Sequence, residues 1–148
     1  MGLEGGELSF VTAASPSDCF AAVLDFESYP SWQGPIESCT VLERDSDGRG
    51  SLVESVVDLK IRQARYVLRY SYEEPRLVRW TFVEGDPKDV AGEFVFEDDG
   101  AGGTRGVYRQ AIDVGRLGML ARGPAKAGLK KLLLDEAVRD LKARVEAA

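Results

Sequence analysis

The side chains able to carry chemistry in this chain are tyrosines, arginines and carboxylates, because its 148 residues include no histidine and only two cysteines. Histidine is the commonest general base and metal ligand in proteins, so its absence narrows the possible reactions. Cys19 and Cys39 are too few and too far apart in the sequence to form a metal site. We therefore expect no metal and no cofactor, and any catalysis would depend on tyrosine, arginine, carboxylate or ordered water.

Two stretches contain residue types that are typical of functional motifs, but they do not meet the other requirements of those motifs. The glycine-containing stretch 100–103 lacks the lysine and serine that follow the glycines of a phosphate-binding loop. Asp98 and Asp99 lie in the same turn, so we interpret them as solvated carboxylates and not as a glycosidase pair. The hydrogen-bonding candidates that remain are Tyr108 and Gln110, which share one face of an expected strand.

These residues belong to a series of short strands separated by turns. Ser15 and Pro16 predict the start of a helix that ends near Phe26, and residues 29–32 predict a short turn of helix or a loop. Alternating patterns bounded by turn residues predict strands over 7–13, 39–43, 51–59, 62–73, 77–84, 90–97 and 104–114. The short turns between the last six strands predict an antiparallel meander.

Alternation within the strands also predicts which side chains face the interior. The pairs expected to face inward are Trp80 with Phe82, Phe94 with Phe96, and Tyr108 with Gln110. Tyr29 and Trp32 are aromatic residues in a loop or short helical turn, and they need burial against another element.

Residues 123–145 predict a long helix, with no proline after Pro124 and no glycine after Gly128. Its apolar stripe includes Leu129 and Leu133 and is wide enough to need a large partner surface. The upstream strands can supply that surface only as a sheet that curls about the helix. We therefore expect an α+β domain with a hollow between helix and sheet, provided that the facing side chains do not fill it.

Bulk composition describes an ordinary globular domain. The chain is 44% hydrophobic and 30% charged, and its length fits one domain over residues 1–148. The formal net charge of −6 argues against nucleic acid as a partner. No apolar run approaches the roughly 18 residues of a membrane-spanning helix, so we expect a soluble, cytoplasmic protein without membrane insertion.

The order of these elements and several local motifs resemble a known superfamily. The motifs are Ala14-Ser15-Pro16, residues 25–32, residues 41–45, residues 72–80, residues 94–97 and residues 102–105. The chain is similar in these features to the polyketide cyclase/dehydrase and lipid-transport superfamily, the START-like or Bet v 1-like (SRPBCC) helix-grip fold. The resemblance covers the whole chain.

The resemblance implies an apolar cavity between the curved sheet and the long helix. Tyr29 and Trp32 would lie at its entrance, and Leu129 and Leu133 would close it from the helix side. The remaining lining would comprise Trp80, Phe82, Phe94, Phe96, Tyr108 and Gln110. Alternation selects the same faces for these six residues independently.

The strand over residues 62–73 has two alternative registers. Hydrophobicity places Tyr66, Tyr70 and Tyr72 inside, together with Leu68. The register implied by the resemblance instead places Arg69 inside, where it could bind a ligand carboxylate or enolate. In that register the tyrosines would form an outer patch suited to a homodimer. A slip of one residue exchanges the two faces.

The resemblance leaves more than one function open, since the fold hosts carriers, receptors and enzymes. The first hypothesis is binding or transport of a small hydrophobic ligand, such as a lipid, an isoprenoid or quinone, or a polyketide. The alternative is an aromatase/cyclase-type enzyme for aldol cyclisation and dehydration, but Ile36, Ser71 and Phe82 occupy the positions of expected polar catalytic groups. A third, protein-binding reading resembles the ribosome-associated branch, and the acidic charge speaks against ribosomal RNA.

Overall fold

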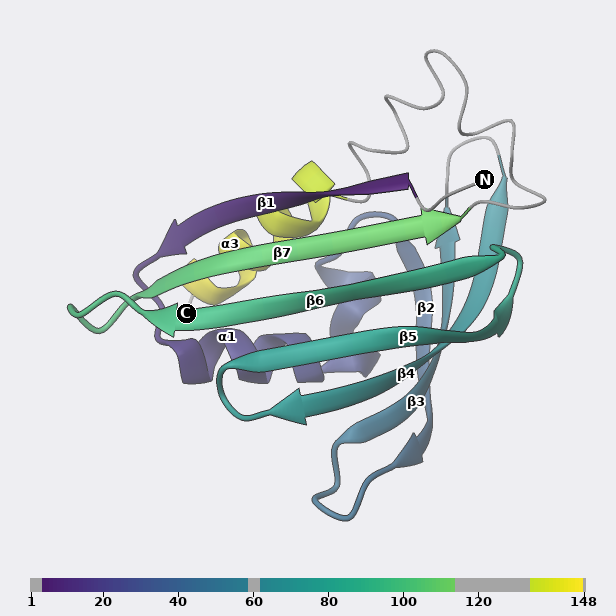
Figure 1. Cartoon of the computed structure of the whole chain (residues 1–148), viewed down its shortest axis with the longest axis horizontal. Helices are drawn as coiled ribbons and strands as arrows, with labels where there is room; N and C mark the ends of the chain where they lie inside the picture. Colours follow the sequence, from purple (N-terminus) through teal and green to yellow (C-terminus); the bar gives the residue numbers. More distant parts are fainter. Residues whose placement is uncertain (1–3, 59–61, 114–133, 148) are drawn as a thin grey trace.

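The computed structural model describes residues 4–58, 62–113 and 134–147, which form one antiparallel sheet with helices against one of its faces (Figure 1). The strands are β1 (Glu4–Thr12), β2 (Ile36–Arg44), β3 (Gly50–Asp58), β4 (Gln63–Glu73), β5 (Leu77–Gly85), β6 (Asp89–Asp98) and β7 (Thr104–Asp113). The helices are α1 (Pro16–Leu24), the 3₁₀-helix η1 (Phe26–Ser31) and α3 (Glu136–Glu146).

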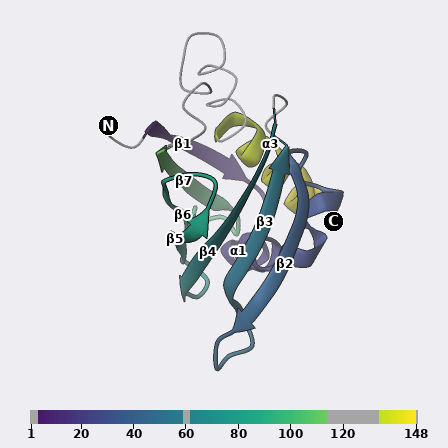
Figure 2. The same cartoon turned by 90° about the vertical axis from the view of Figure 1, so that its right-hand side faces the viewer.

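The seven strands follow the order β1-β7-β6-β5-β4-β3-β2, so every neighbour is a consecutive hairpin except β1, which pairs with β7. The chain therefore crosses from one edge of the sheet to the other through α1 and η1. Figure 2 shows that the sheet bends so strongly that β2, β3 and β4 enclose α1 and α3 from a second side. The predicted α+β helix-grip fold is confirmed.

The first helix begins where the sequence predicts it. The Ser15 hydroxyl accepts a hydrogen bond from the Asp18 N–H at 3.1 Å, and Pro16 occupies the first turn. Cys19, Phe20 and Val23 form its buried face. The short turn predicted over residues 29–32 is part of η1, where the buried Tyr29 donates its phenol hydrogen to the Val23 carbonyl.

The C-terminal helix α3 is the described part of the helix predicted over 123–145. Ala137, Val138 and Leu141 face the core. The Asp140 carboxylate accepts the Gly34 N–H at 3.0 Å, which ties α3 to the loop before β2. Leu129 and Leu133 lie outside the described residues.

The structure decides the open register of β4 in favour of hydrophobicity. Tyr66, Tyr70 and Tyr72 pack against the core, whereas Arg69 is exposed. Arg69 pairs with the exposed Thr81 of β5, and Tyr70 pairs with the buried Trp80. The pairing with β5 therefore also places Arg69 on the outer face and Tyr70 on the inner face. The prediction of Arg69 as a cavity cation is therefore wrong. The outer tyrosine patch, which was the reason to expect a homodimer, does not form.

Charged side chains cross the outer face of the sheet in a ladder from β1 to β5. The Arg109 guanidinium lies 2.9 Å from the Glu7 carboxylate and 2.6 Å from that of Glu93. Glu93 also pairs with Arg79 at 3.0 Å. Partial burial raises the pKa of Glu93, but hydrogen bonds from Arg79 and Arg109 outweigh it and hold that pKa below its usual value.

We predict that Glu93→Gln lowers the free energy of unfolding by about 1 kcal/mol at neutral pH, the scale of cross-strand ion pairs. Because the folded pKa is depressed, this stabilisation is complete above the unfolded pKa of about 4.3 and is lost as the pH falls through the folded pKa. Urea denaturation at pH 7 and pH 3 measures the difference.

Glu97→Gln is the matched control, since Glu97 faces outward on the same strand and has no ion pair within the described part of the chain. An equal loss of stability in both variants at pH 7, or a Glu93→Gln loss that is undiminished at pH 3, would contradict the prediction.

Candidate functional site

A cavity of about 70 Å³ lies between the concave face of the sheet and the helices. Its wall combines residues from six of the seven strands and helix segments that precede or follow them. The lining residues are Val23, Tyr29, Gln33, Ile36, Ser55, Tyr66, Leu68, Tyr70, Trp80, Phe94, Tyr108, Gln110 and Ala137.

Five of the residues predicted from the sequence line this cavity, namely Tyr29, Trp80, Phe94, Tyr108 and Gln110. The structure places the other described candidates elsewhere. Trp32, Phe82 and Phe96 pack in the surrounding core, and Arg69 lies on the opposite face of the sheet. The structure gives the position of these five side chains, and their role in binding stays a prediction.

Apart from Arg69, the residues predicted to line the cavity included none from β3 or β4. Tyr66 and Tyr70 line the cavity from β4, and Ser55 lines it from β3. The alternation of tyrosine with other residues in 62–73 indicated that Tyr66 and Tyr70 face inward. The alternative register, with Arg69 inward, kept them out of the predicted lining. Alternation along β3 places Ser55 on the same face as Val53 and Val57, so its hydroxyl is a polar point in an otherwise apolar part of the wall.

Aromatic rings occupy the centre of the concave face. The centroid of Phe94 lies 4.6 Å from Tyr108 and 5.8 Å from Trp80, and those two rings are 6.1 Å apart. Tyr70 extends the group, 5.8 Å from Trp80. Such contacts contribute about 0.5–1.5 kcal/mol each beyond area burial. The rings therefore stabilise the fold and also account for the small volume that remains.

A hydrogen-bonded relay connects three of the lining residues. The Trp80 indole N–H donates to Gln110 Oε1 at 3.1 Å. The Gln110 side-chain amide then donates to the Tyr108 hydroxyl at 3.2 Å. The relay spans β5 and β7, although β6 lies between these strands.

Gly92 on β6 makes this span possible. It pairs with Trp80 on one side and with Gln110 on the other. A Cβ atom at Gly92 would lie 2.6 Å from Trp80 Nε1, so only glycine lets the indole lie across β6 in this position. Sequence reasoning missed Gly92, although a glycine inside a strand is a signal of close approach by another group.

The cavity is uncharged, because none of its described lining residues is an acid, an arginine or a lysine. Burial raises the pKa of the phenols of Tyr29, Tyr66, Tyr70 and Tyr108 above their usual value. These hydroxyl groups therefore stay protonated and can donate hydrogen bonds.

A buried thiol, that of Cys39, lies beside the cavity. Its sulfur is 3.6 Å from the Ser55 hydroxyl, and burial raises its pKa to about 11. The thiol therefore stays protonated near neutral pH and adds no charge to this side of the cavity.

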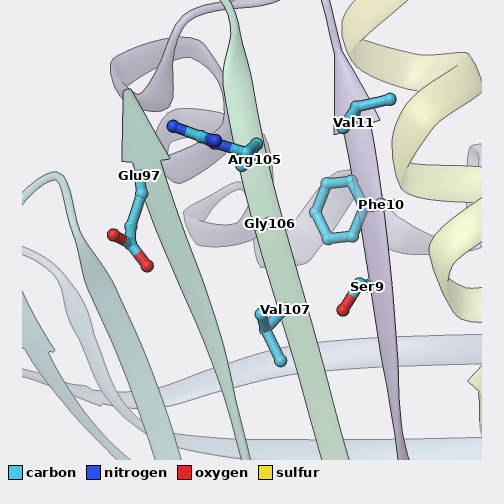
Figure 3. Close-up of a pocket in the computed structure, with 7 residues that line it drawn as sticks. All are labelled: Ser9, Phe10, Val11, Glu97, Arg105, Gly106 and Val107. Atoms are coloured by element: carbon cyan, nitrogen blue, oxygen red, sulfur yellow. The ribbon is translucent and has the colours of Figure 1, made fainter. Parts of the chain in front are cut away.

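A second hollow, of about 660 Å³, lies over β1, β6 and β7 (Figure 3). Ser9, Val11, Glu97, Arg105 and Val107 contribute to it, and Val11 is 64% exposed. It is therefore an open depression on the outer face of the sheet and not an enclosed cavity.

The described residues contain no group of three or more histidine, cysteine or acidic side chains placed to hold a metal ion. No helix among them has the length and apolar character needed to cross a membrane.

Comparison with known proteins agrees with the fold. Residues 7–146 match the model of a family described as polyketide cyclase / dehydrase and lipid transport. A START superfamily protein from Mycobacterium smegmatis has a similar structure, with a TM-score of 0.83, 25% sequence identity and 99% of each chain covered. No curated protein sequence matches this chain.

The Zhui aromatase/cyclase from Streptomyces sp. R1128 is also similar, with a TM-score of 0.78, 17% identity, and coverage of 98% of this chain and 93% of that one. A protein from Thermus thermophilus has a TM-score of 0.81 at 20% identity, with 97% of this chain and 98% of that one covered. At these identities the likeness establishes a shared fold.

We predict that neither thiol of the native protein reacts rapidly with Ellman's reagent at pH 8. Cys19 and Cys39 are both buried, and the raised pKa of Cys39 leaves almost no thiolate at this pH. In guanidinium chloride both thiols should react at once. Rapid reaction of one thiol in the native state would contradict the burial of these side chains.

We also predict that Gly92→Ala displaces the Trp80 indole and breaks its hydrogen bond to Gln110. Overpacking of this kind costs about 2 kcal/mol. Chemical denaturation measures the loss of stability, and the indole N–H resonance in a ¹⁵N spectrum reports the hydrogen bond.

Gly34→Ala is the control, because its Cβ would meet only Asp140 at an ordinary 3.8 Å. If the Trp80 indole resonance is unchanged in Gly92→Ala, the close approach described above is not the determinant of the relay.

Proposed function

Because the chain belongs to the polyketide cyclase / dehydrase and lipid transport family, we propose that it binds a small hydrophobic molecule between its concave sheet and its helices. The candidates are a lipid, an isoprenoid or quinone, or a polyketide. The observation that carries the proposal is the inner cavity, which has aromatic walls, no charge among its described lining residues, and a few hydrogen-bonding groups. This is the usual character of a small-molecule site.

The cavity is too small to hold a drug-sized ligand without rearrangement of its walls. Sites for drug-sized ligands enclose roughly 300–1,000 Å³, whereas this cavity encloses about 70 Å³. A ligand of that size must therefore displace side chains. Tyr70 is the candidate, since its ring lies in the cavity wall 5.8 Å from that of Trp80 and the residue is only partly buried.

Binding is better supported than cyclase-type catalysis. An aldol cyclisation needs groups that take up and deliver protons near neutral pH, and buried phenols with raised pKa values are poor bases. Of the positions where the family resemblance led us to expect polar catalytic groups, Ile36 lines the cavity as an apolar residue and Ser71 is exposed on the outer face. The similarity to the Zhui aromatase/cyclase supports the fold and not its chemistry.

We predict that the purified protein takes up at least one apolar compound from a panel of fluorescent lipids, quinones and polyphenols. Trp80→Ala should weaken this uptake roughly tenfold, because one aromatic contact contributes about 1 kcal/mol or slightly more. Fluorescence titration and native mass spectrometry measure the binding.

Thr81→Ala is the control, since Thr81 adjoins Trp80 in sequence and is exposed on the outer face. Trp80→Phe, which keeps a ring at this position, covers the case in which Trp80→Ala does not fold. Absence of binding across the panel would overturn the proposal. Cyclisation of a linear poly-β-ketone by the protein would favour the enzyme instead.

A further inference from the structure

The relay between Trp80, Gln110 and Tyr108 has only one possible direction. An indole N–H can donate a hydrogen bond but cannot accept one. Gln110 must therefore turn its Oε1 toward Trp80, as the 3.1 Å contact shows. This orientation turns the amide NH₂ toward Tyr108, whose oxygen accepts at 3.2 Å.

The direction of the relay leaves one hydrogen unused at its end. Because the Tyr108 oxygen accepts from Gln110, its own hydrogen must find a different acceptor. Across residues 4–58, 62–113 and 134–147, no group accepts a hydrogen bond from the Tyr108 hydroxyl. Tyr108 is 5% exposed and lines the cavity. Burial raises its pKa, so the hydroxyl keeps this hydrogen under all ordinary conditions.

From this geometry we infer that the cavity selects neutral, planar ligands that carry a carbonyl group, and that Tyr108 donates its hydrogen to that carbonyl oxygen. The inference rests on the proposed binding function and names the ligand class. Gln110 and Trp80 act as positioning residues, since they orient the Tyr108 hydroxyl through the relay.

The absence of charge in the wall excludes a carboxylate as the preferred acceptor. A carboxylate that leaves water needs a cation or several donors to offset its desolvation. The arginine once expected in the wall, Arg69, is exposed on the opposite face of the sheet. A ketone or quinone oxygen needs only one hydrogen bond and costs far less to bury.

The neighbouring rings explain the preference for a planar ligand. Trp80 and Phe94 lie beside Tyr108, with centroids 6.1 and 4.6 Å from it. A flat ring system can stack on these faces while its carbonyl meets the Tyr108 hydroxyl. A hydrocarbon of the same shape would stack equally well but would leave the buried hydroxyl hydrogen without an acceptor.

The test compares three probes of similar size: 2-acetylnaphthalene, 2-ethylnaphthalene and 2-naphthoate. We expect the ketone to bind roughly fivefold more tightly than the ethyl compound, the scale of one hydrogen bond. We expect the carboxylate to bind at least about tenfold more weakly than the ketone at pH 7. The carbonyl stretching band of bound 2-acetylnaphthalene should shift to lower wavenumber relative to its position in hydrocarbon solvent.

Three variants test whether the preference for the ketone and the shift of its carbonyl band depend on the relay. Tyr108→Phe should abolish the preference for the ketone over the ethyl compound and remove the carbonyl shift. Trp80→Phe should reduce both, because Gln110 is then free to turn its amide. Tyr72→Phe is the control, since its hydroxyl donates to the Gly50 carbonyl at 2.5 Å and does not line the cavity.

The ratio of two affinities within one variant is insensitive to a partial loss of folded protein, so a destabilised variant still gives a result. Binding of the ketone and ethyl compounds with equal affinity, tighter binding of 2-naphthoate, or an unchanged preference in Tyr108→Phe would overturn the inference and leave the binding function standing. Failure of all three probes to bind, together with the lipid, quinone and polyphenol panel, would overturn both.

Discussion

The inner face of a strongly bent sheet has little room for large side chains, and this chain places most of its aromatic residues there. Glycine provides the space. A Cβ atom at Gly106 would lie 2.2 Å from the Phe10 ring, and one at Gly92 would lie 2.6 Å from Trp80. Each ring lies across the strand at its glycine instead of standing upright on the sheet. The aromatic centre of the fold, the relay and the small cavity all depend on this close approach.

The two faces of the sheet differ in their electrostatics. Arginine and glutamate side chains pair across the outer face, where water reduces the cost of charge. The polar groups of the cavity wall are hydroxyls, amides and an indole, which can be buried when they are hydrogen-bonded. Because charged side chains lie on the outer face and not in the cavity wall, the chemistry available in the cavity is limited. This separation favours recognition of a neutral ligand over acid and base catalysis.

Much of the fold could be predicted from local patterns. Alternation assigned the inward faces of β5, β6 and β7, including Trp80, Phe94 and Tyr108, and the structure agrees. The cap at Ser15 was equally predictable, because it depends on residues within one helical turn. For β4 the pattern alone supported two registers. The pairing of Arg69 with Thr81 on the neighbouring strand decided between them, and that pairing links residues from different parts of the chain.

The sequence by itself determined the kinds of element, their order and the residue types that could face a cavity, because these follow from spacings of two to four residues. Only the tertiary structure decided the volume of the cavity, the exposure of Arg69 and the direction of the relay from Trp80 to Tyr108. Those properties arise where side chains from separate strands compete for the same space. The role of Gly92 illustrates the physical reason, since a missing side chain has no consequence until a ring from the next strand lies over it.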